Sequence, residues 1–465
     1  MSIDKFDGYT HADFVHECIT TEFDGMDEAN TFFQEYFPLV YAFIAQGKPF
    51  YLCKNASDSD LSRVESLTGN LNVKLIVVVN GMPQQKVFKL KLDKFLETAV
   101  KNNAVEVYSN LCCKPRDHNL KPREFNLWDE FISYNGECDK DTEELLQDNN
   151  LKQLIDFIKD IICSGNENHF NYLITWLKHI MEKPWEKTEI CFFLQSEQGC
   201  GKGNLTNFLR KHVFGLHCSG LVCGLRSLTQ KHNSIVANKS FMVVDELPAT
   251  SDDFHGQFDT MKHLITEDSL SIEPKGKEIY EIDNNCNFMM SGNNLFSLKI
   301  EESDRRYACF QVSNSRRGDK PYWDNLCNNV LTAETGLLFT NYLLSFNKQV
   351  NLKNIPDTNI RNELKNNSKS SSLKYIDDLV LGEYDIPNVM FMPTFKTKNG
   401  EVKYGLTSKN LYLNYKDYCQ HTGERCMKLK VFANIIQTKM SSKMYSIKGK
   451  KARLYDLGDI EYSRD

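Results

Sequence analysis

Between residues 190 and 312, short apolar runs alternate with amphipathic stretches. The runs Glu189–Leu194, Lys239–Glu246 and Asn287–Asn294 are continuous rather than alternating, as in strands that are buried on both faces. Helical spacing fills the intervals between them, which is the pattern of a parallel sheet in an α/β domain. Before this region, Asn150–Cys163 and His169–Lys183 carry apolar residues at helical spacing. They predict a pair of helices, with Trp176 in the core.

The first part of the chain predicts a mixed α/β region. Val73–Val79 and Gln85–Leu92 are strand-like, and Asn80–Met82 forms a turn between them. Asp93–Asn103 follows with helical spacing and an aspartate cap. No convincing paired-aspartate cluster of the kind that a primase or polymerase requires is found here.

The last part of the chain predicts a separate small module. The polar stretch Asn351–Ser372 reads as a linker or an exposed helix. Two helices, Ser408–His421 and Lys428–Met440, precede a hairpin over Met444–Leu457 with a basic turn. Helix, helix and basic hairpin follow one another in a winged-helix domain. The alternative is a helical cap whose basic turn is only solvated.

Composition and charge narrow the class of protein. A chain of 465 residues predicts two to four domains. The net charge of −6 gives no global attraction for nucleic acid, so basic patches must supply it. The apolar runs are far shorter than the ~20 residues that span a bilayer, and no signal peptide is expected from the acidic N-terminal stretch. The 15 cysteines form no C-x-x-C pair, which favours reduced thiols in a soluble intracellular protein.

The stretch "SEQGCGKGN" resembles a phosphate-binding loop with two departures. The usual pattern is G-x-x-x-x-G-K-[S/T]; here Ser196 replaces the first glycine and Gly203 the hydroxyl residue. A strand precedes the loop and a helix over Asn204–Phe214 follows it, so helix amides are expected to point at a phosphate. The nucleotide would be held by nine residues: Ser196, Glu197, Gln198, Gly199, Cys200, Gly201, Lys202, Gly203 and Asn204.

The missing hydroxyl is the more serious departure, since that side chain normally ligates Mg²⁺. Asn204, Thr206 or water is expected to take its place. A second acidic element supports the site, because the strand "FMVVDE" ends in Asp245 and Glu246. Asp245 would hold the water shell of Mg²⁺, and Glu246 would orient the attacking water. By itself, this pair would favour an ordinary solvated strand end; its position after the loop, in a strand–helix–strand chain, favours the metal site.

Three further stretches carry candidate functional residues. Leu270–Ile282 predicts a projecting hairpin with Lys275 and Lys277 at its tip, suited to gripping a nucleic-acid backbone. Asn293, or else Asn294, follows a strand and can bond a γ-phosphate or the water. Arg305 and Arg306 precede another strand, and one of them can act as an arginine finger across a subunit boundary. Solvated turns and a surface ion pair are the plain alternatives.

The order of these elements resembles superfamily 3 helicases of the AAA+ class. It is more closely similar to the helicase part of viral, phage and plasmid primase–helicases. The matching stretches are "FNLWDEF", "SEQGCGKGN", "FMVVDE", "MKHLIT" leading into "IEPKGKE", "SGNN", "SDRRYACF" and the C-terminal "LYLNYKDYC". The resemblance covers about residues 120–460. Members of this group often have G-K-G in the loop, whereas Ser196 remains a departure from the pattern.

The resemblance implies an AAA+ P-loop core and a DNA helicase that hydrolyses ATP with Mg²⁺. It implies a ring, usually a hexamer, with Lys202, Asp245, Glu246 and Asn293 from one subunit and Arg305 or Arg306 from its neighbour. The Lys275/Lys277 hairpins would line the pore and move single-stranded DNA, with RNA not excluded. Priming would come from a separate primase or polymerase. No membrane contact is expected.

The expected domains are an N-terminal α/β region over residues 1–120, a helical collar over 121–185, the ATPase domain over 186–350 and the winged-helix-like domain over 366–465. Two other functions stay open. One is a P-loop ATPase that remodels or packages nucleic acid without unwinding it. The other is a degenerate nucleotide-binding scaffold that recruits replication proteins.

Overall fold

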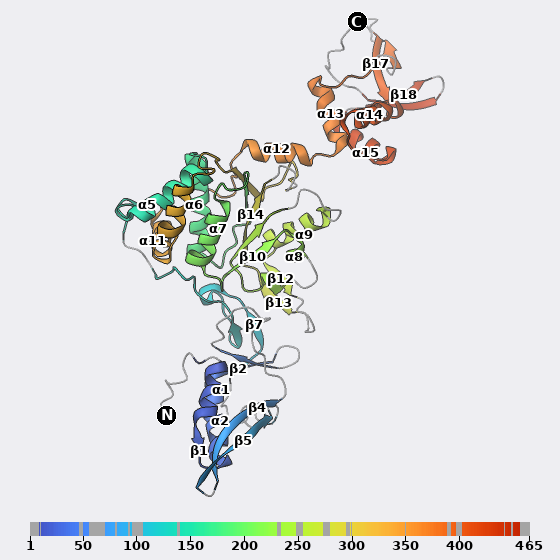
Figure 1. Ribbon diagram of the computed structural model, residues 1–465. Coiled ribbons are helices and arrows are strands. Elements are labelled where there is room, and N and C mark those ends of the chain that lie inside the picture. Colours follow the sequence, from blue (N-terminus) through green and yellow to red (C-terminus); the bar gives the residue numbers. More distant parts are fainter. Residues whose placement is uncertain are drawn as a thin grey trace. The chain divides into compact units, whose positions relative to one another are not determined.

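The computed structural model separates the chain into two compact units, residues 1–298 with 305–361 and residues 299–304 with 362–465. Both units are drawn in Figure 1. The described residues are 9, 11–45, 50–54, 70–79, 81–91, 94, 106–136, 140–229, 234–247, 254–272, 280–293, 298, 300–348, 350–387, 392–396, 402–440, 442–447 and 450–455. Within them, no helix has the length and apolar character needed to cross a bilayer.

The N-terminal region is mixed α/β, as predicted. Its elements are α1 (His11–Thr20), β1 (Glu22–Phe23), α2 (Met26–Val40), β2 (Tyr41–Ile44), β3 (Phe50–Cys53), β4 (Asn70–Val79), β5 (Met82–Lys91) and β6 (Val107–Tyr108). The predicted hairpin is confirmed, because β4 and β5 pair antiparallel with Val79 opposite Met82. Gly81 has φ +76°, which the tight turn requires. The predicted helix over 93–103 lies outside the described residues except for Lys94.

A short connecting region leads to the helices that precede the main sheet. The connecting region contains β7 (Asn110–Cys112) and β8 (Glu124–Asn126). The helices that follow are α4 (Thr142–Leu145), α5 (Asn149–Asp156) and α6 (Glu167–Glu182). Helix α5 continues as a π-helical turn over Phe157–Ile162. Asp148 and Asn166 cap the N-termini of α5 and α6 with their side chains. The two predicted helices are therefore confirmed.

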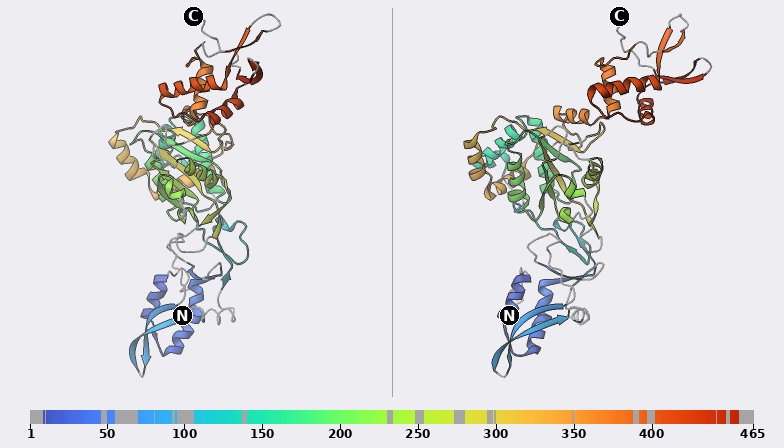
Figure 2. Two further views of the ribbon diagram at one scale, coloured as in Figure 1. Left: turned by 90° about the vertical axis from the view of Figure 1, so that its right-hand side faces the viewer. Right: turned by 45° about the vertical axis from the view of Figure 1, so that its right-hand side comes forward.

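The main sheet has five parallel strands in the order β10-β11-β14-β9-β15. Their bounds are Cys191–Gln195 (β9), Ser219–Cys223 (β10), Phe241–Asp245 (β11), Asn287–Gly292 (β14) and Tyr307–Gln311 (β15). Helices α6, α7 (Lys202–Phe208) and α11 (Ala333–Ser345) lie on one side of the sheet. Helices α8 (Arg226–Thr229) and α9 (Phe254–Thr266) lie on the other (Figures 1 and 2). The predicted parallel α/β domain is confirmed. Glu189 lies before the first strand, with φ +55°.

Two further antiparallel strands and one helix complete this unit: β12 (Ser269–Ile272), β13 (Tyr280–Asp283) and α10 (Lys320–Asn325). Strands β12 and β13 form the predicted hairpin. Its tip, with Lys275 and Lys277, lies outside the described residues, so the predicted strand-gripping site stays a prediction.

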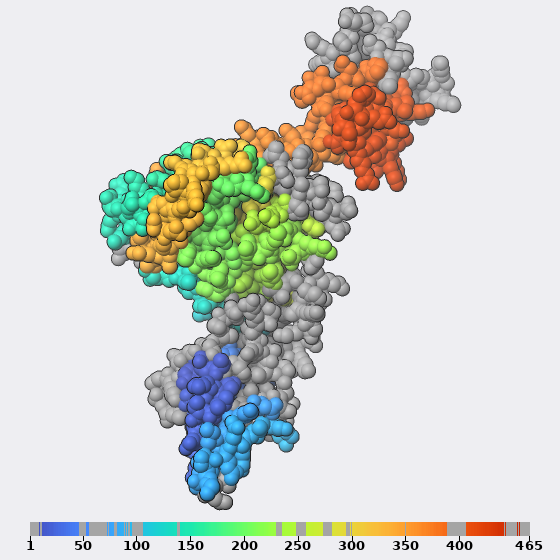
Figure 3. All heavy atoms as spheres, viewed as in Figure 1, coloured from blue at the N-terminus to red at the C-terminus, as the bar shows by residue number. Residues whose placement is uncertain are grey.

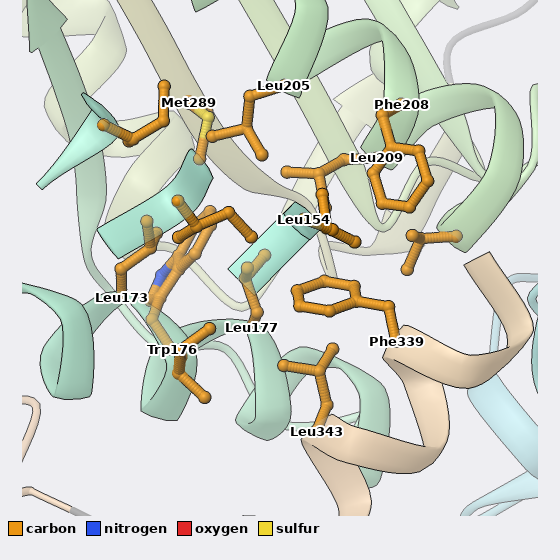
Figure 4. Close-up of a cluster of buried hydrophobic side chains, with 14 of the residues drawn as sticks. Leu154, Leu173, Trp176, Leu177, Leu205, Phe208, Leu209, Met289, Phe339 and Leu343 are labelled. Atoms are coloured by element: carbon orange, nitrogen blue, oxygen red, sulfur yellow. The ribbon is translucent and has the colours of Figure 1, made fainter. Parts of the chain in front are cut away.

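Apolar side chains from helices on one face of the sheet form a large core. Trp176 is fully buried there and packs against Phe192 of β9 at 4.7 Å between ring centroids. Figure 4 shows α5, α6, α7, β14 and α11 contributing to this cluster through Leu154, Leu173, Trp176, Leu177, Leu205, Phe208, Leu209, Met289, Phe339 and Leu343. Residues of α5, α7 and α11, which are far apart in sequence, adjoin one another on the surface (Figure 3). This core fixes the strand and helix on either side of the glycine-rich loop.

The second unit contains most of α12 and a small α/β module. Helix α12 (Asn359–Ser368) forms in the predicted polar stretch, followed by α13 (Ser371–Leu381), β16 (Met392–Lys396), β17 (Val402–Thr407), α14 (Ser408–Thr422), α15 (Leu429–Lys439), β18 (Ser442–Ile447) and β19 (Lys450–Tyr455). Strands β18 and β19 form the predicted hairpin, with Ile447 opposite Lys450. Tyr375, Tyr415 and Phe432 pack in the hydrophobic core of this module. The winged-helix assignment stays a prediction.

Candidate nucleotide site

The glycine-rich loop runs from the end of β9 to the start of α7. Gly199 and Gly201 have φ +80° and +89°, a region that side chains with a Cβ disfavour. A Cβ on Gly201 would also lie 2.6 Å from Cη2 and 2.9 Å from Cζ3 of the Trp323 ring. Helix α7 begins at Lys202, two residues earlier than predicted. The backbone thus turns sharply into the helix, and the amides of its first turn face the loop.

The ammonium group of Lys202 lies inside the loop, within hydrogen-bonding distance of four oxygen atoms for its three donors. These are Ser196 O at 2.9 Å, Ser196 Oγ at 2.6 Å, Glu197 O at 3.1 Å and Asn293 Oδ1 at 3.1 Å. Burial lowers the pKa of Lys202, while Cys200 and Asp245 act in the opposite direction. The lysine is therefore held where a phosphate on the loop would meet it.

The acidic strand end lies at the same edge of the sheet as the loop. Because β9, β14 and β11 are parallel neighbours, their carboxyl ends come together, and Gly292 is level with Gln195. Asp245 accepts a hydrogen bond from the hydroxyl of Ser291. Glu246 has φ +51° and is exposed, and its backbone amide donates to Asp245 Oδ1 at 3.0 Å. Lys202, Asn293 and Asp245 are thus brought together as predicted, whereas Asn294 lies outside the described residues.

Two residues close to Gly203, which replaces the usual hydroxyl residue, differ in whether their side-chain oxygen is available to ligate a metal ion. Thr206 is buried and its hydroxyl donates to Gly203 O at 3.2 Å within the helix. Asn204 is half-buried, and its side chain makes no hydrogen bond to the described residues. A Cβ on Gly203 would meet nothing within 4 Å. The oxygen atoms of Asp245 and Asn204 are of the type that Mg²⁺ prefers, so this donor set fits the ion.

Arg305 and Arg306 lie at the opposite edge of the sheet. They precede β15, whose first residue, Tyr307, is level with Cys191 at the start of β9. Five residues of extended strand place them roughly 13 Å or more from the loop of the same chain. Arg305 is exposed, and Arg306 is half-buried. Neither can reach the loop of its own chain.

Two contacts that support the loop were not predicted from the sequence. Arg317 forms an ion pair with Glu197 of the loop, and both side chains are more than half exposed. Trp323 packs over Gly201 and Phe157, and its indole donates to Arg316 O at 2.8 Å. The partners are more than 100 residues apart in sequence, and no local motif marks them.

A cavity of about 580 Å³ adjoins the loop at Ser196 and Glu197. Its walls include Asn166 and His169 at the start of α6, and the segment Asp357–Ile360. The His169 ring stacks on Phe310 with centroids 4.6 Å apart, and burial lowers the pKa of His169. The His169 imidazole and several polar side chains therefore line a space next to the phosphate loop.

The described part of the chain holds no cluster of three or more His, Cys, Asp or Glu side chains that could bind a metal ion. Its 14 cysteines are free thiols, most of them buried, as predicted. Cys218 is buried, and its thiol donates to Asp129 O at 3.0 Å.

Residues 194–306 match a family described as a family of unknown function, DUF5906. The DNA primase-polymerase of Nitratiruptor phage NrS-1 is 27% identical over 181 residues, which are 37% of this chain and 24% of that protein. The aligned region is thus about a quarter of the relative's length. An apo structure of the NrS-1 C-terminal region (A form) superposes with TM-score 0.55 at 19% identity, over 80% of this chain and 92% of the other. A second apo structure of that region gives TM-score 0.55 at 17% identity, over 80% and 91%. This chain therefore shares the fold of the NrS-1 C-terminal region.

Proposed function

We propose that this chain is a phage replication protein with an AAA+ core that hydrolyses ATP and moves along single-stranded DNA as a ring. The observation that carries the proposal is the meeting of Lys202, Asn293 and Asp245 at the carboxyl edge of the parallel sheet, beside a glycine-rich loop. The similarity to a phage DNA primase-polymerase supports the setting in DNA replication.

Each residue at this edge has a role that its chemistry supports. Lys202 exchanges its four oxygen partners for the β- and γ-phosphate oxygens of ATP. Asp245, with Asn204, would hold Mg²⁺ through its water shell, and the ion would neutralise charge on the transferred phosphoryl group. Asn293 follows β14, the strand between β9 and β11, and can donate to the γ-phosphate through its amide nitrogen. Glu246 accepts a proton from the attacking water.

The position of the arginine pair supports a shared site. Since Arg305 and Arg306 lie at the edge away from Lys202, a role at a γ-phosphate requires a neighbouring subunit. Arg305, which is exposed, is the better candidate for this arginine finger. Oligomers that mix Lys202→Ala with Arg305→Ala subunits should regain part of the turnover that each variant lacks alone.

The cavity beside the loop supports a nucleoside triphosphate as the substrate. The base and ribose would lie against His169 and Asn166 while the phosphates lie on the loop. ATP should therefore bind more tightly than inorganic triphosphate, and His169→Ala should weaken only the binding of ATP.

Steady-state ATP hydrolysis tests the site assignment. Lys202→Ala should abolish turnover, whereas Lys211→Ala, an exposed lysine in the helical continuation of α7, should not change it. Turnover that survives in Lys202→Ala would show that the loop is not the catalytic site. An assembled protein that binds ATP without hydrolysing it would favour a nucleotide-dependent scaffold.

A further inference from the structure

A second and larger cavity, of about 920 Å³, opens at the amino edge of the main sheet. Three segments line it: residues 113–121 after β7, residues 185–190 before β9, and the turn at Asn284 and Asn285 before β14. Arg305 and Arg306, which precede β15, also line it, as do Asp268, Asp283 and Lys353. The cavity is thus separated from the Lys202 loop by the length of the strands.

Positive charge exceeds negative charge in this cavity. Six lining side chains are cationic, namely Lys114, Lys121, Lys187, Arg305, Arg306 and Lys353. Four are acidic, namely Glu186, Glu189, Asp268 and Asp283. Burial raises the pKa of Asp283, while the nearby Lys114 and Lys121 act in the opposite direction. A local cationic excess on a chain with a net charge of −6 indicates an anionic ligand.

The cationic side chains differ in whether they already form ion pairs or hydrogen bonds within the protein. Lys114 pairs with Glu124 at 2.5 Å, and Lys187 donates to Leu264 O at 2.6 Å at the end of α9. By contrast, Lys121, Lys353 and Arg305 are exposed, and their charged groups make no ion pair or hydrogen bond with the described residues. These three groups remain available to phosphate oxygens.

The loop that carries Lys121 is held in an unusual conformation. Arg116, Asp117, Asn119 and Arg123 have φ between +50° and +67°, although none is glycine. Such backbone persists only where surrounding contacts fix it, and it gathers at binding sites. Here Arg116 bonds Glu130 at 2.8 Å and lies 3.7 Å over the Tyr134 ring. The loop is therefore preformed, so binding would cost little ordering entropy.

An aromatic surface lies beside these cations. His118 stacks on Trp185 with ring centroids 4.8 Å apart and planes 11° from parallel. Both rings line the cavity, and His118 is exposed. Stacked rings next to exposed cations are the combination by which proteins bind single strands, the rings taking bases and the cations taking phosphates.

We propose that this amino-edge cavity binds single-stranded nucleic acid. Lys121 and Lys353 contact backbone phosphates, and a base extends the stack of His118 on Trp185. The inference rests on the nucleic-acid binding of the proposed function. It adds a strand contact at the edge opposite the ATP loop, separate from the predicted Lys275/Lys277 tip. Since Arg305 and Arg306 are candidates for a neighbour's ATP site, the test leaves both unchanged.

The test measures the binding of a short fluorescent oligothymidylate by anisotropy at several salt concentrations. Lys121→Glu should weaken binding about fivefold to tenfold and reduce the salt slope by about 0.7, the loss of one phosphate contact on a single strand. His118→Ala should weaken it by at least about fivefold, through lost stacking. Lys152→Glu, which makes the same charge change on the exposed face of α5, should bind like the wild type. Affinity for ATP should be the same in all four proteins.

Each other outcome overturns the inference. If Lys121→Glu and His118→Ala bind the strand as Lys152→Glu does, while Lys275→Ala/Lys277→Ala loses it, the proposed function stands without this site. Competition by inorganic triphosphate as strong as that by the strand would show a small-anion site instead. A wild-type protein that hydrolyses ATP but binds no strand would contradict both this inference and the DNA part of the proposed function. Thermal melting checks that each variant is folded, and Lys121→Ala serves as a milder substitution.

Discussion

The ammonium group of Lys202 donates a hydrogen bond of 2.6 Å to the hydroxyl of Ser196, the residue that replaces the first glycine of the loop pattern. The same hydroxyl donates to Glu197 O at 2.8 Å, so its proton is committed and its lone pairs face the lysine. The serine is therefore a partner of the lysine that must contact phosphate. The departure from the pattern has a specific structural consequence.

Ser196→Ala should bind ATP more tightly than the wild type. Without the Ser196 hydroxyl, Lys202 loses one hydrogen-bond acceptor in the nucleotide-free protein, which destabilises that state. The contacts of Lys202 with the phosphates of bound ATP are unchanged. The expected gain is up to about tenfold, or about 1.4 kcal/mol. Calorimetric titration with ATP and Mg²⁺ measures it, with Ser345→Ala as a control elsewhere on the surface. Weaker binding would show that the Ser196 hydroxyl contacts the nucleotide instead.

Gly203→Ser should lower the Mg²⁺ concentration needed for half-maximal ATP turnover, by a fewfold. The added Cβ meets no atom within 4 Å, and the hydroxyl restores the ligand that phosphate loops normally supply. Gly203→Ala is the matched control, since it adds the same Cβ without the oxygen. If alanine and serine have equal effects, the hydroxyl is not what the site lacks.

Gly201→Ala should damage the loop more than Gly199→Ala does. Both glycines have positive φ, so each substitution strains the backbone by about 1 kcal/mol or more. Only at Gly201 does the new Cβ also collide with the Trp323 ring. We expect a larger fall in both melting temperature and ATP affinity for Gly201→Ala, measured by thermal unfolding and titration. Equal losses would show that the Trp323 contact is unimportant.

Lys187 should make the stability of the protein depend on alkaline pH. Burial lowers the pKa of Lys187 to about 8 from its ordinary value of 10.5. Between these values the unfolded chain binds a proton that the folded chain lacks, so the free energy of unfolding rises with pH. The slope is at most about 1.4 kcal/mol per pH unit. Denaturant unfolding from pH 8 to 10 should show this rise in the wild type relative to Lys187→Met. A difference that stays constant with pH would contradict the shifted pKa.

The sequence was sufficient to predict the elements that build the candidate site. Each of the strands β9, β11 and β14 contains one unbroken apolar run, and the loop before α7 is one short glycine-rich stretch. Such local patterns can be recognised in the sequence. The Glu197–Arg317 pair and the Trp323 contact were missed because each joins segments more than 100 residues apart. The amino-edge cavity was missed for the same reason. Its basic side chains come from separate segments and form no run in the sequence.

ATP hydrolysis with and without single-stranded DNA tests the central claim most directly. It would be measured with Mg²⁺ on the full chain, with its assembly sized by light scattering. The proposal predicts a ring-sized assembly whose hydrolysis rises severalfold with the strand and is lost in Lys202→Ala. Hydrolysis that the strand leaves unchanged, or an assembled protein that hydrolyses no ATP, would contradict a motor on single-stranded DNA.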